Sequence, residues 1–167
     1  MNNYTREELL ALGFSHVGQN TAVSRDARFF NISGELEDQV RIDAFSIITG
    51  EVHLGRSTHV SPLCFLSATG GAIYMEDSSG IGPQVSLLTK SDNYTAADLT
   101  EANKLAGDIR IGQHSILGAG CKVFPGVTIG RHASIGSNCV VSKDVAAGDI
   151  VVSRGAPLIS MGNRLDS

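Results

Sequence analysis

The sequence predicts a single all-β domain built as a solenoid of short strands, and two observations lead to this prediction. Aliphatic residues recur at every sixth position, with the longest run between residues 111 and 141. Small residues follow them at fixed places in the repeat, and the chain contains 19 glycines. A period of six fits neither the turn of an α-helix nor the two-residue alternation of a sandwich strand. Six-residue repeats instead indicate short flat strands joined by tight bends, three to a coil, with each coil buried against its neighbours.

The repeat runs along most of the chain but is interrupted twice. Its phase slips by three residues through the sequence TGG at 69–71. Residues 89–108 show no repeat, so we expect this segment to leave the solenoid as a protruding loop, a frequent place for function. The aliphatic positions are Val17, Val23, Ile42, Ile48, Leu54, Val60, Leu66, Met75, Ile81, Leu87, Ile111, Leu117, Val123, Ile129, Ile135 and Val141.

The two ends of the chain leave the repeat. Thr5, with Glu8 three residues later and an apolar run behind it, forms a capping-box pattern that predicts a short helix over the open end of the solenoid. We therefore divide the chain into a capping helix (1–15), a β-helix with its loop (16–152) and a C-terminal tail (153–167).

Composition restricts the partners and the compartment. A net charge of −4 without basic runs argues against nucleic acids and anionic membranes as partners. The sequence shows no apolar run of membrane-spanning length and no signal-peptide pattern at its start. The three cysteines each occupy the small-residue place of a repeat, which predicts packing, and their odd number does not suit a disulfide scaffold. We expect a cytoplasmic protein with reduced thiols.

Several stretches resemble the hexapeptide-repeat acyltransferases. The most specific are the repeat run 111–145, with GAGCKVFPGVTIG at 118–130 and VVSKDV at 140–145, and the sequence GAP at 155–157. The N-terminal helix and VRIDAFSIITG at 40–50 are similar to the branch that acetylates nucleotide-linked 4-amino-4,6-dideoxy sugars for surface polysaccharides. The resemblance implies a left-handed parallel β-helix, a homotrimer with active sites between subunits, and acetyl-CoA as the co-substrate.

The resemblance also assigns residues to acetyl-CoA. In this family, backbone amides near a GAG-like turn hold the thioester and the pantetheine arm, and the later SK and GAP segments flank the nucleotide end. Lys143 and Arg154 are candidates for pairing with phosphates, although Lys143 also fits a solvated surface charge. The expected acetyl-CoA residues are Gly118, Ala119, Gly120, Ser142, Lys143, Arg154, Gly155, Ala156 and Pro157.

The loop bears on the choice of acceptor. The O-acetyltransferases of this superfamily carry a histidine as general base in the loop that matches TKSDNYT, whereas this chain has Asp92 and Asn93 there. An amine with a pKa of about 7.7–8.0 is already partly neutral near pH 7 and needs less help than a hydroxyl. The missing histidine therefore favours an amine acceptor, with Asp92 as a base or as the partner of the ammonium group. A solvent-exposed turn explains Asp92 equally simply.

His114 and His132 occupy the same place in successive coils, so we expect them to stack on one outer face. His114 immediately precedes the segment expected to hold the thioester and is the first candidate for the catalytic base, with Asp92 as the second. A pair of surface histidines without a chemical role is the alternative. A third histidine at metal-binding spacing is missing, so we expect no metal.

The acceptor is expected to be an amino group of a dTDP-linked amino-deoxy sugar, acylated directly in a ternary complex. Asp43 also fits a salt bridge with Arg41 on an outer face. The alternatives are a sugar O-acetyltransferase of the galactoside or maltose type and a non-catalytic trimeric scaffold. The residues expected to contact the acceptor are Asp43, Tyr74, Ser91, Asn93 and Tyr94.

Overall fold

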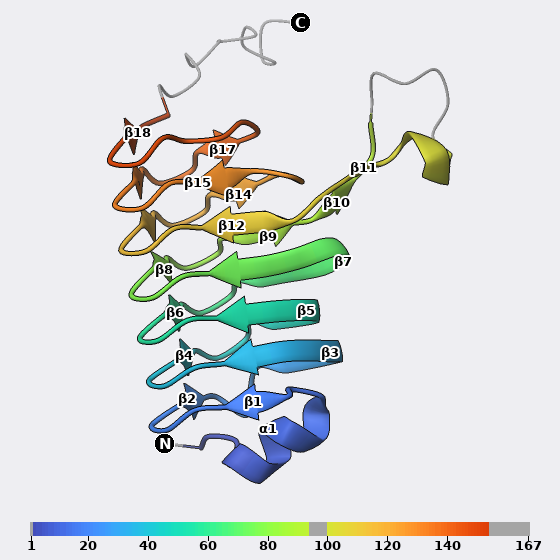
Figure 1. Cartoon of the computed structure of the whole chain (residues 1–167), viewed down its shortest axis with the longest axis vertical. Coiled ribbons are helices and arrows are strands. Elements are labelled where there is room, and N and C mark those ends of the chain that lie inside the picture. The colour runs from blue at the N-terminus through green and yellow to red at the C-terminus, as the bar shows by residue number, and fades with distance from the viewer. Residues whose placement is uncertain (1, 94–99, 154–167) are drawn as a thin grey trace, which may run out of the picture.

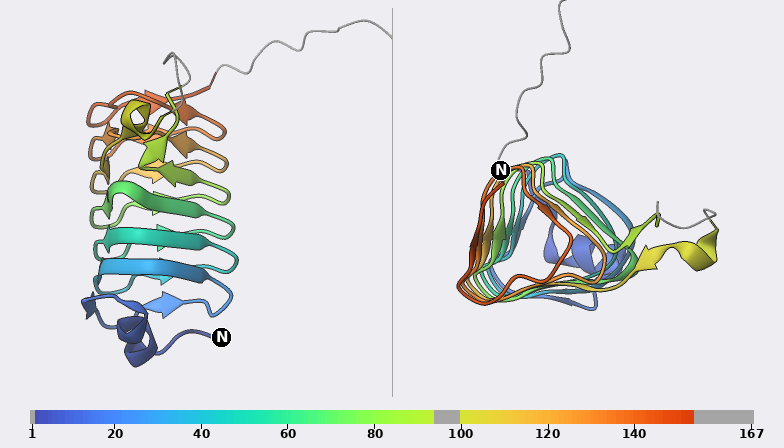
Figure 2. Two further views of the ribbon diagram at one scale, coloured as in Figure 1. Left: turned by 90° about the vertical axis from the view of Figure 1, so that its right-hand side faces the viewer. Right: turned by 90° about the horizontal axis from the view of Figure 1, so that it is seen from above.

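The chain forms a parallel β-helix with a triangular cross-section, which confirms the predicted fold class (Figures 1 and 2). The structure is a computed structural model and describes residues 2–93 and 100–153. In Figure 1 the strands nearest the viewer run from right to left while the chain rises from its N-terminus, which is the sense of a left-handed screw.

Three parallel faces make up the prism, and the chain visits them in the order 1, 2, 3. Face 1 contains β1 (His16–Val17), the second halves of β3 (Arg28–Leu36), β5 (Ile47–Leu54) and β7 (Phe65–Met75), then β12 (Ile109–Ile111) and β15 (Thr128–Ile129). Face 2 contains β2 (Ala22–Val23), β4 (Arg41–Ile42), β6 (His59–Val60), β8 (Gly80–Ile81), β13 (Ile116–Leu117), β16 (Ser134–Ile135) and β18 (Ile150–Val151). Face 3 contains the first halves of β3, β5 and β7, then β9 (Ser86–Leu88), β14 (Lys122–Val123) and β17 (Val140–Val141).

A short helix, α1 (Arg6–Leu12), covers the N-terminal end of the prism. Its first turn has the predicted capping box, because the Thr5 hydroxyl accepts the Glu8 N–H at 3.3 Å and the Glu8 carboxylate accepts the Thr5 N–H at 2.8 Å. Leu9 of this helix is buried in the core cluster. The helix therefore shields the apolar interior of the first coil from water.

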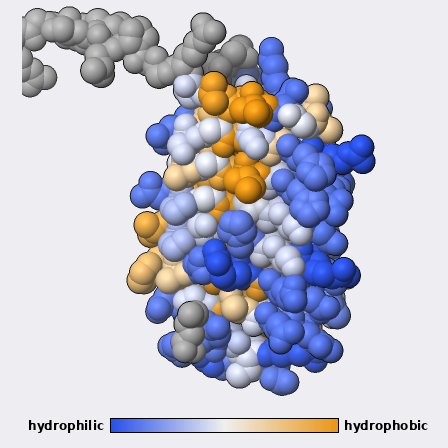
Figure 3. Space-filling model, turned by 90° about the vertical axis from the view of Figure 1, so that its left-hand side faces the viewer, coloured by the Kyte–Doolittle hydropathy of each residue, from blue (hydrophilic) through white to orange (hydrophobic). Residues whose placement is uncertain are grey.

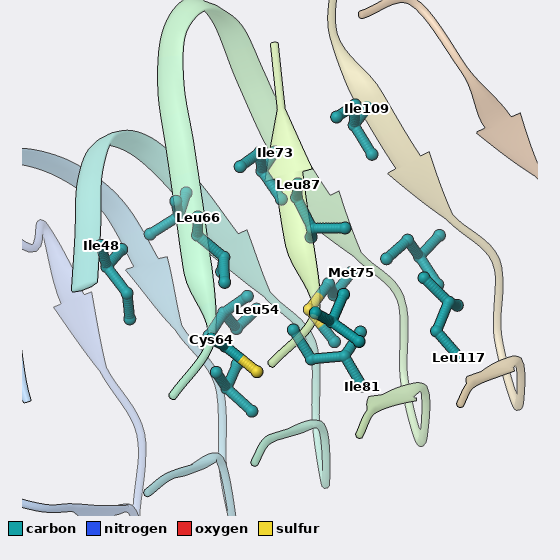
Figure 4. Close-up of a cluster of buried hydrophobic side chains, with 14 of the residues drawn as sticks. Ile48, Leu54, Cys64, Leu66, Ile73, Met75, Ile81, Leu87, Ile109 and Leu117 are labelled. Carbon is teal, nitrogen blue, oxygen red and sulfur yellow. The ribbon is translucent and has the colours of Figure 1, made fainter. Parts of the chain in front are cut away.

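The core is a stack of the repeated aliphatic side chains. Figure 4 shows how these side chains point into the prism from successive coils. Leu66, Leu87 and Leu117 are completely buried. The three cysteines are also buried and are free thiols, so their predicted packing role is confirmed.

The phase slip at 69–71 corresponds to a bulge in β7. Gly50 pairs with Ala68 and Val52 pairs with Ile73, so residues 69–72 of β7 lie opposite the single residue Glu51 of β5. The three extra residues widen one corner of the prism and leave the aliphatic positions on both sides in register.

The three corners of the prism are named here by the faces that they join. Corner A joins faces 1 and 2 and includes the turns 112–115 and 130–133. Corner B joins faces 2 and 3 and includes the turns 118–121 and 136–139. Corner C joins faces 3 and 1 and includes the β7 bulge, the loop 89–108 and the turns 124–127 and 142–144.

Candidate functional site

The loop leaves the prism at corner C as a two-stranded ribbon. Its strands β10 (Lys90–Ser91) and β11 (Leu105–Ala106) pair in antiparallel fashion. The short 3-10 helix η1 (Glu101–Asn103) comes just before β11 in the chain. Figure 2 shows this ribbon projecting from one corner of the triangle and rising beside the coils that follow it. The expectation that residues in 89–108 leave the solenoid is confirmed for the part that the structure describes.

The β7 bulge anchors the base of the ribbon. The Thr89 hydroxyl donates to the Ser67 carbonyl at 2.9 Å and accepts the Gly70 N–H at 3.0 Å. A Cβ atom on Gly70 would lie 2.6 Å from the Thr89 carbonyl oxygen and 2.7 Å from the Lys90 Cβ atom. The ribbon therefore packs on bare backbone, and the glycine at this position is required by close approach.

Ion pairs connect the two sides of the ribbon. The Glu101 carboxylate pairs with Lys90 at 2.6 Å and with Lys104 at 2.9 Å, and Lys104 also lies 3.6 Å from Asp92. Hydrogen bonds from Lys90 and then Lys104 lower the pKa of Glu101 to about 2, and Glu101 in turn raises the pKa of Lys104. Asp92 remains largely exposed, with one cation beside it.

A hollow of about 260 Å³ lies between the ribbon and the two coils that follow. It brings together three residues that were predicted separately, since Ser91 and Asp92 come from the acceptor and catalytic sets and Ser142 from the acetyl-CoA set. Lys143 lines an adjacent hollow that shares Ser142. The residues around the main hollow, the loop hollow, are Ser91, Asp92, Leu105, Phe124, Pro125, Val140 and Ser142.

His114 and His132 stack at corner A. Their ring centroids are 5.0 Å apart with an interplanar angle of 23°, so the predicted stacking is confirmed. Both residues have a φ of 58° at the turn. Corner A is a different edge of the prism from corner C, so one chain does not bring His114 to Asp92.

The GAG turn lies at corner B, and its backbone is largely used by the fold. The Gly118 N–H donates to the Ile135 carbonyl at 2.7 Å, and the Gly120 N–H donates to the Pro83 carbonyl at 2.9 Å. Those two amides cannot also hold a thioester without breaking hydrogen bonds of the coil. The assignment of Gly118, Ala119 and Gly120 to acetyl-CoA stays a prediction, and at Gly118 and Gly120 a thioester would have to compete with these backbone hydrogen bonds.

Two predicted acceptor residues lie away from the loop hollow. Asp43 is 3.3 Å from Arg41 and lines a hollow near the N-terminal segment, which is the alternative that the sequence left open. Tyr74 lies on face 1, stacked on His53 with centroids 4.9 Å apart and covered by the Arg110 guanidinium at 4.0 Å. Neither Asp43 nor Tyr74 lines the loop hollow that contains Asp92.

The remaining predicted residues lie at the end of the described part of the loop or outside the described residues. Asn93 is partly exposed at the end of the described part of the loop. Tyr94, Arg154, Gly155, Ala156 and Pro157 lie outside the described residues. Within residues 2–93 and 100–153, no group of three His, Cys, Asp or Glu side chains gathers as a metal site, and no helix has the length and hydrophobicity to span a membrane.

Sequence reasoning missed the apolar side of the loop hollow. Leu105, Phe124, Pro125 and Val140 come from three separate segments that only the fold brings together. The sequence carried only a weak indication of this wall. Leu105 is a large apolar residue in the loop, which has no repeat, and Val140 is one at an outward-facing position of the repeat.

Comparison with known proteins places the chain in a family. Residues 108–143 match the bacterial transferase hexapeptide family (six repeats). The dTDP-4-amino-4,6-dideoxy-D-glucose acyltransferase of Escherichia coli is 30% identical over 132 residues, which cover 72% of this chain and 68% of that protein. The chain belongs to the hexapeptide-repeat acyltransferases. The predicted family and enzyme class are thereby confirmed.

Solved structures of the family superpose closely. AntD, an N-acyltransferase from Bacillus cereus in complex with dTDP and 3-hydroxybutyryl-CoA, is 29% identical with a TM-score of 0.82, covering 99% of this chain and 93% of that one. A single-residue variant of AntD in complex with dTDP-4-amino-4,6-dideoxyglucose and coenzyme A is 30% identical with a TM-score of 0.82, covering 94% and 88%. A variant of GDP-perosamine N-acetyltransferase from Caulobacter crescentus, 20% identical with a TM-score of 0.59, covers 86% of this chain and 57% of that one and shares the fold.

Proposed function

We propose that the protein is an acyl-CoA-dependent N-acyltransferase that acts on a dTDP-linked amino-dideoxy sugar. The main support is the similarity to AntD, whose complex contains dTDP-4-amino-4,6-dideoxyglucose together with coenzyme A. The loop adds independent support, because it offers Asp92 and no histidine where a hydroxyl acceptor would need a base. The acyl group is broader than the acetyl group expected from sequence, since AntD also binds 3-hydroxybutyryl-CoA.

The reaction is a direct transfer. The neutral amine of the sugar attacks the thioester carbonyl carbon, a C–N bond forms and the C–S bond breaks. Coenzyme A leaves as a thiolate, and the proton lost from nitrogen goes to that thiolate, to a side chain or to water. The products are an amide and free coenzyme A, so each turnover releases one thiol.

In this proposal Asp92 binds the acceptor amine. Its carboxylate lies at the rim of the loop hollow and has Lys104 at 3.6 Å, which leaves room for a second cationic partner such as the sugar ammonium. As an ion pair, Asp92 orients the amine; once the amine is deprotonated, its nitrogen can attack. His114 remains our first candidate for the proton acceptor, and it requires a neighbouring subunit to reach the loop.

A homotrimer fits this requirement. The predicted site residues within 2–93 and 100–153 lie at all three corners of one prism, and contacts between chains would bring them together. Apolar side chains are also exposed along face 3 and corner B, among them Phe45, Ile47, Leu63 and Phe65. Ile47 and Phe65 are neighbours in register on adjacent strands and form a continuous apolar strip. Such a strip is typical of a surface that another chain covers.

The location and biological use are part of the same proposal. Three buried free thiols suit the reducing cytoplasm, where we place the enzyme. We assign its product, an N-acylated sugar nucleotide, to the assembly of surface polysaccharides such as lipopolysaccharide.

The test is a thiol-release assay with an aromatic disulfide reagent. The protein is mixed with acetyl-CoA or 3-hydroxybutyryl-CoA and with dTDP-4-amino-4,6-dideoxyglucose, and the matched control replaces the amine by dTDP-6-deoxyglucose, which offers hydroxyls only. We expect thiol release with the amine and none above background with the control. Release with the control alone would establish an O-acyltransferase, and no binding of any acyl-CoA would indicate a scaffold; either result contradicts the proposal.

A further inference from the structure

We propose that the loop hollow binds the acyl chain of the thioester and that Leu105, Phe124 and Val140 limit its length. This inference rests on the proposed N-acyltransferase function and assigns the part of the site that selects the acyl group. It names short unbranched acyl groups, longer than acetyl, as the preferred class.

The first observation is the apolar wall of the hollow. Leu105 is 45% exposed and Val140 is 64% exposed, and both line the hollow together with Phe124 and Pro125. Leaving large aliphatic side chains in water is unfavourable, and their convergence from β11, the 124–127 turn and β17 is not required by the repeat. A concave apolar surface with a few polar groups at its rim is typical of a small-molecule site.

The second observation is the position of Asp92 on the same hollow. If Asp92 holds the amine, the thioester carbonyl must lie within bonding approach of that amine during the reaction. The acyl chain begins at this carbonyl, so it lies within a few bond lengths of Asp92. The surface available at that distance is the apolar wall formed by Leu105, Phe124 and Val140.

The third observation is size. A volume of about 260 Å³ has room for roughly eight water-sized groups at about 30 Å³ each. This accommodates a chain of about four carbons and is filled by one of about eight, whereas a fatty acyl chain of palmitoyl length is too long. The hydroxyls of Ser91 and Ser142 at the rim can donate to or accept from a hydroxyl substituent on such a chain.

The ribbon keeps this hollow in shape. Ser91 pairs with Leu105 across the antiparallel ribbon, so the residue at the polar rim and the residue in the apolar wall are fixed side by side. The Glu101 ion pairs close the ribbon above them. The choice among acyl groups therefore depends on the ribbon strands β10 and β11, which hold Ser91 and Leu105 in place.

The experiment compares acetyl-, butyryl- and palmitoyl-CoA with dTDP-4-amino-4,6-dideoxyglucose held constant. Each buried methylene is worth about fourfold in affinity, so butyryl-CoA is expected to exceed acetyl-CoA in kcat/KM by up to about 15-fold. Palmitoyl-CoA, whose chain exceeds the hollow, is expected to react worse than butyryl-CoA. Val140→Phe narrows the hollow, so the butyryl-to-acetyl ratio of kcat/KM is expected to fall about tenfold.

Ile116→Phe is the matched control. Ile116, like Val140, is the exposed first residue of a two-residue strand, at 56% exposure, but it lies on face 2 away from the loop. The butyryl-to-acetyl ratio should stay unchanged in this variant. An unchanged ratio in Val140→Phe would overturn the proposal, and so would an equal loss for all three acyl groups, which would assign the hollow to the pantetheine arm.

A binding measurement separates this inference from the proposed function. Calorimetric titration of the protein with acetyl-CoA and butyryl-CoA, without acceptor, should show the same preference and the same effect of Val140→Phe. If thiol release fails with every amine sugar while this preference is present, the acceptor assignment is wrong and the acyl site stands. If thiol release succeeds and the preference is absent, the acyl site is wrong.

Discussion

Corner C is built differently before and after the loop. Before it, β3, β5 and β7 pass through the corner as continuous strands of nine, eight and eleven residues. After it, the strands on faces 1 and 3 have two or three residues, and the corner is made by short turns with Pro125 and Ser142. The early coils close the corner with paired backbone, whereas the later coils leave side chains free to line a hollow.

This difference between early and late coils indicates where along a solenoid a ligand-binding site can form. Continuous strands use their backbone donors and acceptors in the ladder and present a flat edge. Where the ladder is interrupted, an inserted ribbon and exposed turns can surround a ligand. Figure 3 shows face 2, where strongly apolar surface gathers towards the C-terminal end. Ile116 and Ile150 of this face are exposed.

The largest expected effect is a loss of free energy of unfolding when a core leucine is shortened, and it should differ between the coils before and after the loop. Leu66 and Leu117 are both completely buried, but Leu66 lies in the long strand β7 and Leu117 in the two-residue strand β13. Large-to-small changes cost more where the surroundings cannot collapse, so we expect Leu66→Ala to cost about 4 kcal/mol and Leu117→Ala about 2.5 kcal/mol in free energy of unfolding. Urea denaturation measures both, and an equal or larger cost at Leu117 would remove the distinction.

The next effect separates corner C from corner A. Asp92→Asn keeps the shape of the side chain and removes the charge that we assign to amine binding, so kcat/KM for the amino sugar should fall about 100-fold. His114→Gln should lower kcat by about 100-fold and leave the KM for the sugar little changed, as expected for a general base. Steady-state kinetics on both variants distinguishes the roles. An effect at Asp92 of less than threefold would place amine binding elsewhere.

A smaller effect is expected at the β7 bulge. Gly70→Ala places a Cβ atom 2.6 Å from the Thr89 carbonyl oxygen and 2.7 Å from the Lys90 Cβ atom, so the ribbon must move away. We expect kcat/KM to fall about tenfold with little change in melting temperature. Gly136→Ala is the control, since its Cβ would meet the Val151 carbonyl oxygen and the Val152 side chain at 3.3 Å. These neighbours need to shift by only a few tenths of an ångström, so the loss of kcat/KM should be clearly smaller than at Gly70. Equal activity of the two variants would show that the bulge does not position the loop.

The smallest effect is expected at the ion pairs of the ribbon. The lowered pKa of Glu101 means that the folded ribbon favours the ionised carboxylate, so this stabilisation is present above about pH 4.5 and is lost as the pH falls through about 2. Because Glu101 is fully exposed, Glu101→Gln should leave global stability nearly unchanged and raise proteolytic cleavage in the loop a few-fold at pH 7. High salt should likewise raise the rate of proteolytic cleavage in the loop of the wild-type protein, because it screens the ion pairs. A cleavage rate independent of both would contradict the anchoring role.

The sequence predicted the regular parts of this molecule and only part of its site. The six-residue period determines the faces and the core, and the slip at 69–71 marked the bulge, because each follows from local spacing. The loop hollow depends on how Leu105, Phe124 and Val140 meet across corner C, which no local pattern encodes. The distances between corners, which separate His114 from Asp92, also follow from the closed triangular section rather than from spacing along the chain.

The most direct test of the account is a crystal structure of the protein with coenzyme A and dTDP-4-amino-4,6-dideoxyglucose. We predict that the amino group of the sugar lies within hydrogen-bonding distance of Asp92 at corner C, with the thiol of coenzyme A beside the loop hollow. A sugar bound instead against Tyr74 on face 1, or at the Asp43 hollow, with Asp92 facing solvent, would contradict the assignment of the site.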